Sequence, residues 1–498
     1  MAQPNAKQSA LRVAKSIEAH SLVAVIFGAL IYILAVTGTV SVFNHELQRW
    51  EQPDAPEMES ISPEAAERAA LSVFESEAAP TTHLYINFPQ DDLPRTVVTT
   101  DTQAFLANAD GTVAVRESFP WTQFLLDLHY YLHLPQILGL TVVGALGAML
   151  IALSFSGLLA HPRIFRDAFI FRRGAGRLTS VDLHNRLSVW TLPFHFSNAL
   201  TGSILGLASI LAFAIAAIGY ESDVAAVFEP IFGGEPDPVS GRAQVADIAG
   251  PLNFMAKEFP DLGVTYFIVH EPGTAGQHSS IIAEHRDRLI FGEYYNFTAT
   301  GEYEGHVGIS DGTVGQQVTG AVYNVHFGNW GGIPIKLAYL VFGLVLCVII
   351  ASGLSIYFAK REVNGRPARR LAGAWQGVVW GTPVMLAMTL VAGLAGAEGT
   401  ALVAFFWIGW LGLCVAAASV GAQKAAAALT ALLAAALALA TALYGARYGG
   451  AALSQAGLPM TIVAAGLATT FAALAAQKRR AIKTDVFDLG SAEVQAAE

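Results

Sequence analysis

The segment HSLVAVIFGALIYILAVTG, residues 20–38, has a counterpart in HNRLSVWTLPFHFSNALTG, residues 184–202. Both segments begin with histidine, both end in Thr-Gly after the same number of residues, and both are mostly apolar in between. An imidazole inside or at the edge of a bilayer is costly unless it has a use, so such histidines are candidates for function. The repeat therefore predicts a duplicated membrane protein with matched histidines in its two halves.

A second repeat supports the duplication. His129 precedes Ser156-Gly157 by 27 residues, and His326 precedes Ser352-Gly353 by 26, in each case across an apolar segment. His133 follows His129 by four residues, a spacing that places both on one face of a helix. We expect two sites, each built from one histidine per half. The expected pairs are His20 with His184, and His129 or His133 with His326, with His129 preferred because its offset matches better.

The composition indicates a polytopic membrane protein, because 53% of the 498 residues are hydrophobic and only 14% are charged. A helix needs about 20 apolar residues to cross the core of a bilayer. Segments of that kind occur at 21–43, 137–160, 192–219, 335–358, 373–395, 400–422, 425–445 and 457–477. We expect a mainly α protein with eight transmembrane helices: a duplicated core of two plus two, and a four-helix carboxyl-terminal extension. The first apolar run is too long for a cleaved signal peptide.

The basic residues predict the orientation. Of the 29 lysines and arginines, 19 lie in the two tails and in the connections that eight spans would place on the same side. The positive-inside rule assigns that side, and with it both termini, to the cytoplasm. The two long loops carry four basic residues each and many acidic ones, so we expect them outside the cytoplasm. The net charge of −10 argues against nucleic-acid binding.

Each long loop is expected to form a small α+β domain. Ser62-Pro63-Glu64 is typical of a helix start, and alternating segments such as 83–88 are typical of strands. The predicted order is tail and first span 1–43, first exported domain 44–128, second span 129–160, basic cytoplasmic loop 161–186, third span 187–219, second exported domain 220–328, fourth span 329–358, cytoplasmic linker 359–372, extension 373–477 and cytoplasmic tail 478–498.

The histidine pattern favours haem. Axial ligands in electron-transfer proteins must stay bound in both oxidation states, and a neutral imidazole does so. The predicted topology places His20 and His184 near the cytoplasmic face and the other candidates near the outer face, so one haem at each face would form an electron path across the membrane. The only cysteines are Cys347 and Cys414, and no Cys-x-x-Cys-His sequence exists. We therefore expect two non-covalent b-type haems.

Several assignments stay open at this stage. His195 follows His184 by eleven residues, past Pro193. Either His195 ligates the inner haem and His184 supports it without binding the iron, or the two histidines serve different haems. His161 is a further candidate partner. The histidines of the exported loops are more simply interpreted as scattered surface residues than as a metal site; they are His83, His270, His278, His285 and His306. Aromatic residues near the outer histidines are expected as membrane anchors and, in a second interpretation, as the vicinity of the substrate. They are Trp121, Tyr130, Tyr131 and Trp330.

Over residues 10–362 the chain resembles the PepSY-associated transmembrane family. The resemblance rests on residues 20–38, LHYYLHLP at 128–135, the segments 182–186 and 193–202, and 325–328. The helix start at 62–64 resembles the opening of a PepSY module, so both exported domains are expected to be PepSY-like. The four helices of the extension go beyond the core of that family.

The resemblance implies a di-haem b oxidoreductase of the bacterial inner membrane. Such an enzyme passes electrons to a ferric siderophore or another Fe(III) chelate in the periplasm and releases Fe(II) for uptake. The implied axial ligands are His20, His184, His129 and His326, with His133 and His195 as further cofactor-binding candidates. No residue is assigned a catalytic role.

The predicted cytoplasmic loops are too short for a flavin domain, so the electrons are expected from a separate cytoplasmic reductase or from quinol. Two other hypotheses remain. One is a membrane-anchored, non-enzymatic regulator of the PepSY type. The other is a transporter that uses its histidines as a proton relay.

Overall fold

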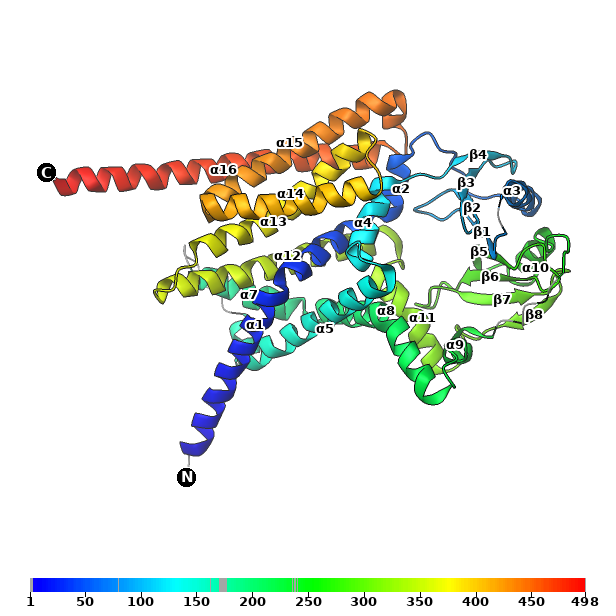
Figure 1. Cartoon of the computed structure of the whole chain (residues 1–498), viewed down its shortest axis with the longest axis horizontal. Helices are drawn as coiled ribbons and strands as arrows, with labels where there is room; N and C mark the ends of the chain where they lie inside the picture. The colour runs from blue at the N-terminus through cyan, green and yellow to red at the C-terminus, as the bar shows by residue number, and fades with distance from the viewer. Residues whose placement is uncertain are drawn as a thin grey trace. The chain divides into compact units, whose positions relative to one another are not determined.

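The computed structural model describes residues 3–78, 80–161, 163–169, 177–234, 236, 239 and 241–497 (Figure 1). Arg172 and Arg173 of the predicted basic loop lie outside these residues. Within the described part, eight helices are long and apolar enough to cross a membrane, in agreement with the predicted architecture. The candidate spans are Leu11–Ser41, Gln136–Ala160, Leu192–Gly219, Gly332–Val363, Arg369–Leu394, Thr400–Val420, Ala422–Leu453 and Leu458–Ile482.

The chain divides into two compact units. The first consists of Met1–Pro53, Pro120–Gly206 and Leu337–Glu498 and contains most of the membrane helices. The second consists of Asp54–Phe119 and Leu207–Lys336 and contains the β-sheet.

The duplication is visible in how the core helices of the first unit pack. These helices are α1 (Gln3–Ser41), α5 (Gln136–Ala160), α8 (Leu192–Gly219) and α12 (Gly332–Val363). Thr39 on α1 lies so close to Gly343 on α12 that no Cβ would fit there. In the equivalent place, a Cβ on Gly147 of α5 would lie 2.6 Å from the hydroxyl of Ser203 on α8. The first helix of each half therefore packs against the second helix of the other half through a hydroxyl and a glycine.

Three of the spans begin close to the predicted apolar segments, but each is preceded by a separate short helix. Short helices precede α5, α8 and α12 as separate elements: α4 (Pro120–Tyr131), α7 (Arg177–Trp190) and α11 (Val314–Phe327). Between α4 and α5 the backbone turns at Leu132 and His133, which both have positive φ angles, of 54° and 56°. The expectation that His129 and His133 share one helix face is therefore wrong, because the helix ends between them. A similar end follows His326, where Gly328 adopts a left-handed conformation with φ 73°.

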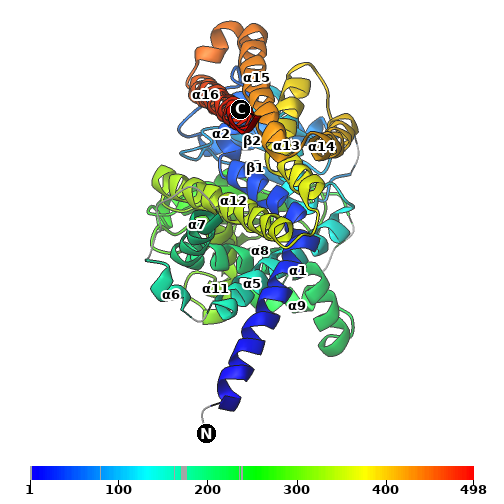
Figure 2. The ribbon, with the colours of Figure 1, turned by 90° about the vertical axis from the view of Figure 1, so that its left-hand side faces the viewer.

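The carboxyl-terminal helices α13 (Arg369–Leu394), α14 (Thr400–Val420), α15 (Ala422–Tyr448) and α16 (Leu458–Ala497) lie side by side (Figures 1 and 2). Small residues bring them close together. A Cβ on Gly377 of α13 would lie 2.5 Å from the Cα of Cys414 on α14. Close approach through small residues is typical of helix packing in membranes. Of these helices α13 is the most buried, and it also packs against α1 and α4 of the core.

The second unit is built on one antiparallel sheet of eight strands. The first long loop supplies α3 (Pro63–Glu75), β1 (His83–Asn87), β2 (Thr96–Thr99), β3 (Ala104–Ala107) and β4 (Val113–Arg116). The second supplies α9 (Ala225–Phe232), α10 (Ala249–Glu258), β5 (Gly263–His270), β6 (His278–Glu284), β7 (Glu293–Phe297) and β8 (Tyr303–His306). As predicted, Ser62 caps α3, and its hydroxyl accepts from the Ala65 amide at 3.2 Å.

The two loops do not form two separate sheets. The strand order is β4-β3-β2-β1-β5-β6-β7-β8, because β1 pairs with β5 from His83↔His270 to Asn87↔Tyr266. Side chains from α3 and α10 share one hydrophobic core with the sheet, including Ala69, Leu252, Ile86 and Phe267. The two modules predicted from the sequence therefore exist as helix-plus-four-strand repeats, but they are joined edge to edge.

Candidate functional site

His20 is held by the second span of its own half. Its Nδ1 lies 3.1 Å from the carbonyl oxygen of Leu153 and 3.1 Å from Oγ of Ser156. The Ser156 hydroxyl itself donates to the Leu153 carbonyl at 3.1 Å, so toward the imidazole it acts as an acceptor. Since both neighbours accept, this network assigns the proton of the ring to Nδ1. Nε2 of His20 is then unprotonated, the form that binds a metal.

His184 has the same surroundings in the other half. Its Nδ1 lies 3.0 Å from the Ile349 carbonyl oxygen and 3.1 Å from Oγ of Ser352, and the Ser352 hydroxyl donates to Ile349. Hydrogen bonds of this kind fix the tautomer and orientation of metal-ligating histidines. The two predicted ligands of the inner pair therefore have equivalent surroundings, and we call them together the His20/His184 site. That they share one haem stays a prediction.

A glycine lies against each imidazole of this site. A Cβ on Gly157 would lie 3.5 Å from Cε1 of His20, and one on Gly353 would lie 3.0 Å from Cε1 of His184. Each glycine directly follows the serine that accepts from the same ring. The Ser-Gly pairs, which the sequence analysis used only as spacing markers, are therefore the residues that seat the two rings.

His129 is seated in the same way by the Thr-Gly pair of α1. Its Nδ1 lies 3.2 Å from Oγ1 of Thr37, whose hydroxyl donates to the carbonyl of Ile33 at 2.8 Å. A Cβ on Gly38 would lie 2.6 Å from Cε1 of His129. Three of the four predicted axial ligands thus have Nδ1 beside a hydroxyl and the ring against a glycine. A hydroxyl residue followed by glycine, repeated in apolar segments, is the sequence signal that identifies these seats.

His326 lies in the second unit, half-buried near the end of α11, with its ring edge-on to Phe327 at 5.5 Å. The sequence repeat makes Thr201-Gly202 the counterpart of the pair that seats His129. Thr201 donates to the Ser197 carbonyl at 2.8 Å, as Thr37 does to the carbonyl four residues before it. The pairing of His326 with His129 stays a prediction.

His133 and His195 have different surroundings from His20, His184 and His129. The ring of His133 stacks on Phe124 with centroids 4.8 Å apart. His195 is 4% exposed, and both of its ring nitrogens lie within 3.3 Å of the Thr191 hydroxyl on the preceding turn. The offset of 164 residues that maps His20 onto His184 maps Ile31 onto His195, so His195 has no counterpart in the first half. Neither histidine is seated on a serine-glycine or threonine-glycine pair among the described contacts.

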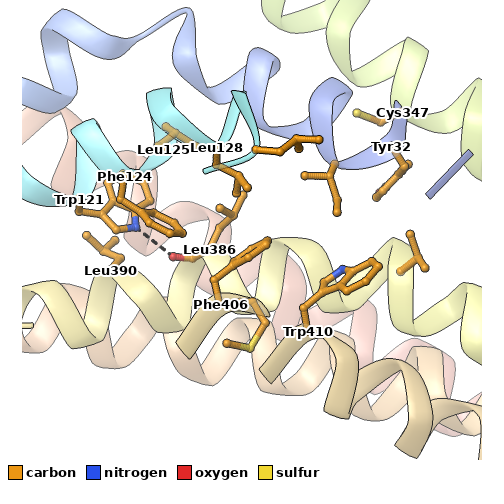
Figure 3. Close-up of a cluster of buried hydrophobic side chains, with 14 of the residues drawn as sticks. Tyr32, Trp121, Phe124, Leu125, Leu128, Cys347, Leu386, Leu390, Phe406 and Trp410 are labelled. Carbon is orange, nitrogen blue, oxygen red and sulfur yellow. Dashed lines mark hydrogen bonds between the residues drawn. The ribbon is translucent and has the colours of Figure 1, made fainter. Parts of the chain in front are cut away.

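Of the four aromatic residues predicted near the substrate, Trp121 has a clear structural role. Trp121 is 6% exposed, and its Nε1 donates to the Leu386 carbonyl of α13 at 3.2 Å (Figure 3). It also donates to the Thr389 hydroxyl of the same helix at 3.2 Å. Trp121 therefore anchors α4 to α13. The ring of Tyr130 lies 6.1 Å from that of His129, and the ring of Tyr131 lies 6.4 Å from that of His133. Trp330 lies half-buried just before α12.

The histidines of the sheet are not scattered as expected. His83, His270 and His278 lie directly opposite one another on β1, β5 and β6. The ring centroids are 5.2 Å apart for the first pair and 4.5 Å for the second. Burial, and then the charges of His278 and His83, lower the pKa of His270 to about 4. Among the described residues no group of three or more His, Cys, Asp or Glu side chains is arranged to hold a metal ion.

The model of the PepSY-associated TM region family matches residues 17–361, a range that contains the histidine seats and both α+β modules. The chain belongs to this family. It is similar to uncharacterized protein PA4219 of Pseudomonas aeruginosa, with 28% identity over 266 residues, 49% of this chain. The matched part spans 64% of that relative's length. The match to the family ends before α13, so the carboxyl-terminal extension lies outside it.

Proposed function

We propose that this family member is a di-haem b oxidoreductase of the bacterial inner membrane that reduces a ferric chelate, such as a ferric siderophore, on the extracytoplasmic side. The observation that carries the proposal is the shared seat of His20 and His184. Two imidazoles at duplicated positions each have the Nδ1 proton directed to a backbone carbonyl and a serine hydroxyl. This arrangement suits a pair of axial ligands.

The donor set fits haem in charge. Neutral imidazoles add no charge to an apolar interior, where an ionised ligand would be expensive. Bound at such a site, haem supplies an iron that alternates between Fe(III) and Fe(II) and so carries one electron at a time. His20 and His184 would hold the haem nearer the cytoplasm. His129 would hold the outer one together with His326, whose assignment rests on the sequence repeat alone.

The overall reaction is a one-electron reduction. The ferric chelate takes up one electron and becomes a ferrous chelate, from which the iron leaves more readily because Fe(II) binds hard oxygen ligands less tightly. The electron comes from a cytoplasmic reductase or from membrane quinol. Residues 54–119 and 220–336 contain 27 acidic and 8 basic residues, so their field favours the approach of neutral or cationic chelates over anionic ones.

An absorbance spectrum of the purified, reduced protein tests the proposal. We expect b-type bands with two haems per chain, and oxidation of those bands when a ferric chelate is added. His184→Ala and His326→Ala should each remove one haem, while His306→Ala, an exposed histidine of β8, serves as the control and should remove none. Colourless protein from haem-replete cells would reject the proposal and favour a regulator or a transporter.

A further inference from the structure

The carboxyl-terminal extension contacts the core at the helix that seats His184. Trp375 of α13 is 5% exposed, and its Nε1 donates to the Ala351 carbonyl of α12 at 3.0 Å. Ala351 lies between Ile349 and Ser352, the two residues that accept from His184. The indole therefore fixes the turn of α12 that orients this imidazole.

A second contact joins the same helix to α1. The hydroxyl of Tyr32 donates to the Val379 carbonyl of α13 at 3.0 Å, and the Tyr32 ring lies edge-on to Trp375 at 6.0 Å. Pro383, four residues after Val379, lies inside α13 and has no amide hydrogen, so the helix itself provides no partner for that carbonyl. Tyr32 supplies the missing donor. A carbonyl left free by a proline and satisfied from α1 is a specific docking point between the extension and the core.

The extension also contacts the helix that carries His129. Trp121, eight residues before His129 on α4, donates to Leu386 and Thr389 of α13 (Figure 3). The amides of Trp121 and Thr122 donate to the carboxylate of Glu51, at 2.9 and 2.6 Å. The backbone carbonyl of Glu51 in turn accepts from the Tyr448 hydroxyl of α15 at 2.6 Å. The start of α4 is therefore held by α13 directly and by α15 through α2 (Asn44–Glu51).

One helix thus contacts both α12, which seats His184, and α4, which carries His129. Trp375 and Thr389 are fourteen residues apart on α13, a rise of roughly 21 Å at 1.5 Å per residue. Val384, Leu386 and Ala387, between them, are at most 5% exposed, so α13 is enclosed along this length. A buried helix between two sites can hold the elements that carry them at a fixed separation.

We propose that α13 is a strut that positions both histidine seats, with Trp375 as the positioning residue for the His20/His184 site and Trp121 as the positioning residue for the His129 site. Any effect of α13 on electron transfer rests on the proposed function, because it requires haem bound at the two sites. Trp375 and Trp121 touch neither ring. They act through the α12 turn and the start of α4, and a change in the Nδ1 hydrogen bond alters the basicity of a ligating imidazole.

The test removes one indole N–H at a time while it keeps an aromatic ring. The variants are Trp375→Phe and Trp121→Phe. Trp410→Phe is the matched control, because Trp410 is also buried and donates at 3.0 Å, but to Thr382 within the extension. The first readout is hydrogen–deuterium exchange of residues 345–356 and 120–133, with and without bound haem. The second is the midpoint potential and the low-spin electron paramagnetic resonance signal of each haem.

We expect Trp375→Phe to speed exchange only in residues 345–356 and to shift the midpoint potential of one haem. Trp121→Phe should speed exchange only in residues 120–133 and shift the potential of the other haem. Trp410→Phe should change neither exchange nor potential. Unchanged exchange in both segments would overturn the proposal that α13 positions the two seats. The same conclusion would follow if all three variants lowered the melting temperature without a local change in exchange. A wild-type protein without haem would reject the proposed function instead, while the exchange measurement would still decide the strut.

Discussion

The imidazole of His129 lies so close to Gly38 that a Cβ at that glycine would come within 2.6 Å of its Cε1 atom. The equivalent separations are 3.0 Å between Gly353 and His184 and 3.5 Å between Gly157 and His20. Real Cβ contacts are ordinary at the longest of these distances and essentially absent at the shortest. The three seats therefore form a graded steric series.

The loss of haem caused by alanine at each of these glycines should follow the order of these separations. Gly38→Ala should displace His129 and remove one haem, Gly353→Ala should lower occupancy of the other haem in part, and Gly157→Ala should leave both in place. The haem-to-protein ratio, measured by the pyridine haemochrome method, checks the order. Equal losses in all three variants would mean that these glycines serve helix packing alone.

The hydroxyl of Thr37 should affect the haem at His129 more than the volume of the Thr37 side chain does. Thr37→Val keeps the volume but removes the acceptor beside Nδ1 of His129, and an unsatisfied buried group of this kind costs about 1–3 kcal/mol. We expect a shifted potential for one haem in Thr37→Val and recovery toward the wild-type value in Thr37→Ser. Potentiometric titration of both haems measures this, and a serine variant that behaves like valine would contradict it.

A double-mutant cycle can test the docking point between α1 and α13. Tyr32→Phe leaves the Val379 carbonyl without its donor, so we expect a loss of about 1–3 kcal/mol in the free energy of unfolding. In a Pro383→Ala background the helix regains an amide for that carbonyl, and the same change should cost less. Detergent-titration unfolding of all four proteins gives the coupling. A coupling of zero would show that the tyrosine and the proline act independently.

Acid should loosen the centre of the sheet. The pKa of His270 is about 4 in the folded protein, where burial disfavours its charged form, against an ordinary value of 6.5. Between those values the unfolded chain binds more protons than the folded protein. The contribution of His270 to the free energy of unfolding is therefore fully present above pH 6.5, and up to about 3 kcal/mol is lost as the pH falls toward 4.

Hydrogen–deuterium exchange of β1 and β5 between pH 4 and 7, corrected for the intrinsic rate, measures this loss of stability. His270→Gln should flatten the profile, and His306→Gln on β8 is the control. A variant at His270 that keeps the wild-type profile would assign the acid sensitivity to another group.

The parts of the molecule that the sequence predicted are those encoded in local patterns. Long apolar runs identified the eight helices, and equal spacing from histidine to a small polar pair identified His20 and His184 as equivalent positions, which have equivalent hydrogen-bond partners. The function of the small pairs was missed, because spacing shows that Ser352 recurs but not that its hydroxyl faces an imidazole. The four-residue spacing of His129 and His133 was misleading, because the chain leaves the helix at Leu132.

Contacts between distant segments were beyond the reach of local patterns. Tyr32 and Val379 are 347 residues apart in sequence, and nothing near either residue indicates the other. The pairing of β1 with β5 is also a contact between distant segments. The alternation of residues in each strand shows which face is buried but does not identify the neighbouring strand. Sequence reasoning therefore gave two separate α+β modules where the structure has one sheet.

That shared sheet constrains the order of folding. His83 and its partner His270 are 187 residues apart, and two candidate membrane spans, Gln136–Ala160 and Leu192–Gly219, are synthesised between them. Until β5 has been synthesised, the edge of β1 that pairs with it has no partner strand, and an open edge can pair wrongly with other chains. The newly made first module therefore needs protection of this edge until the second module has been made.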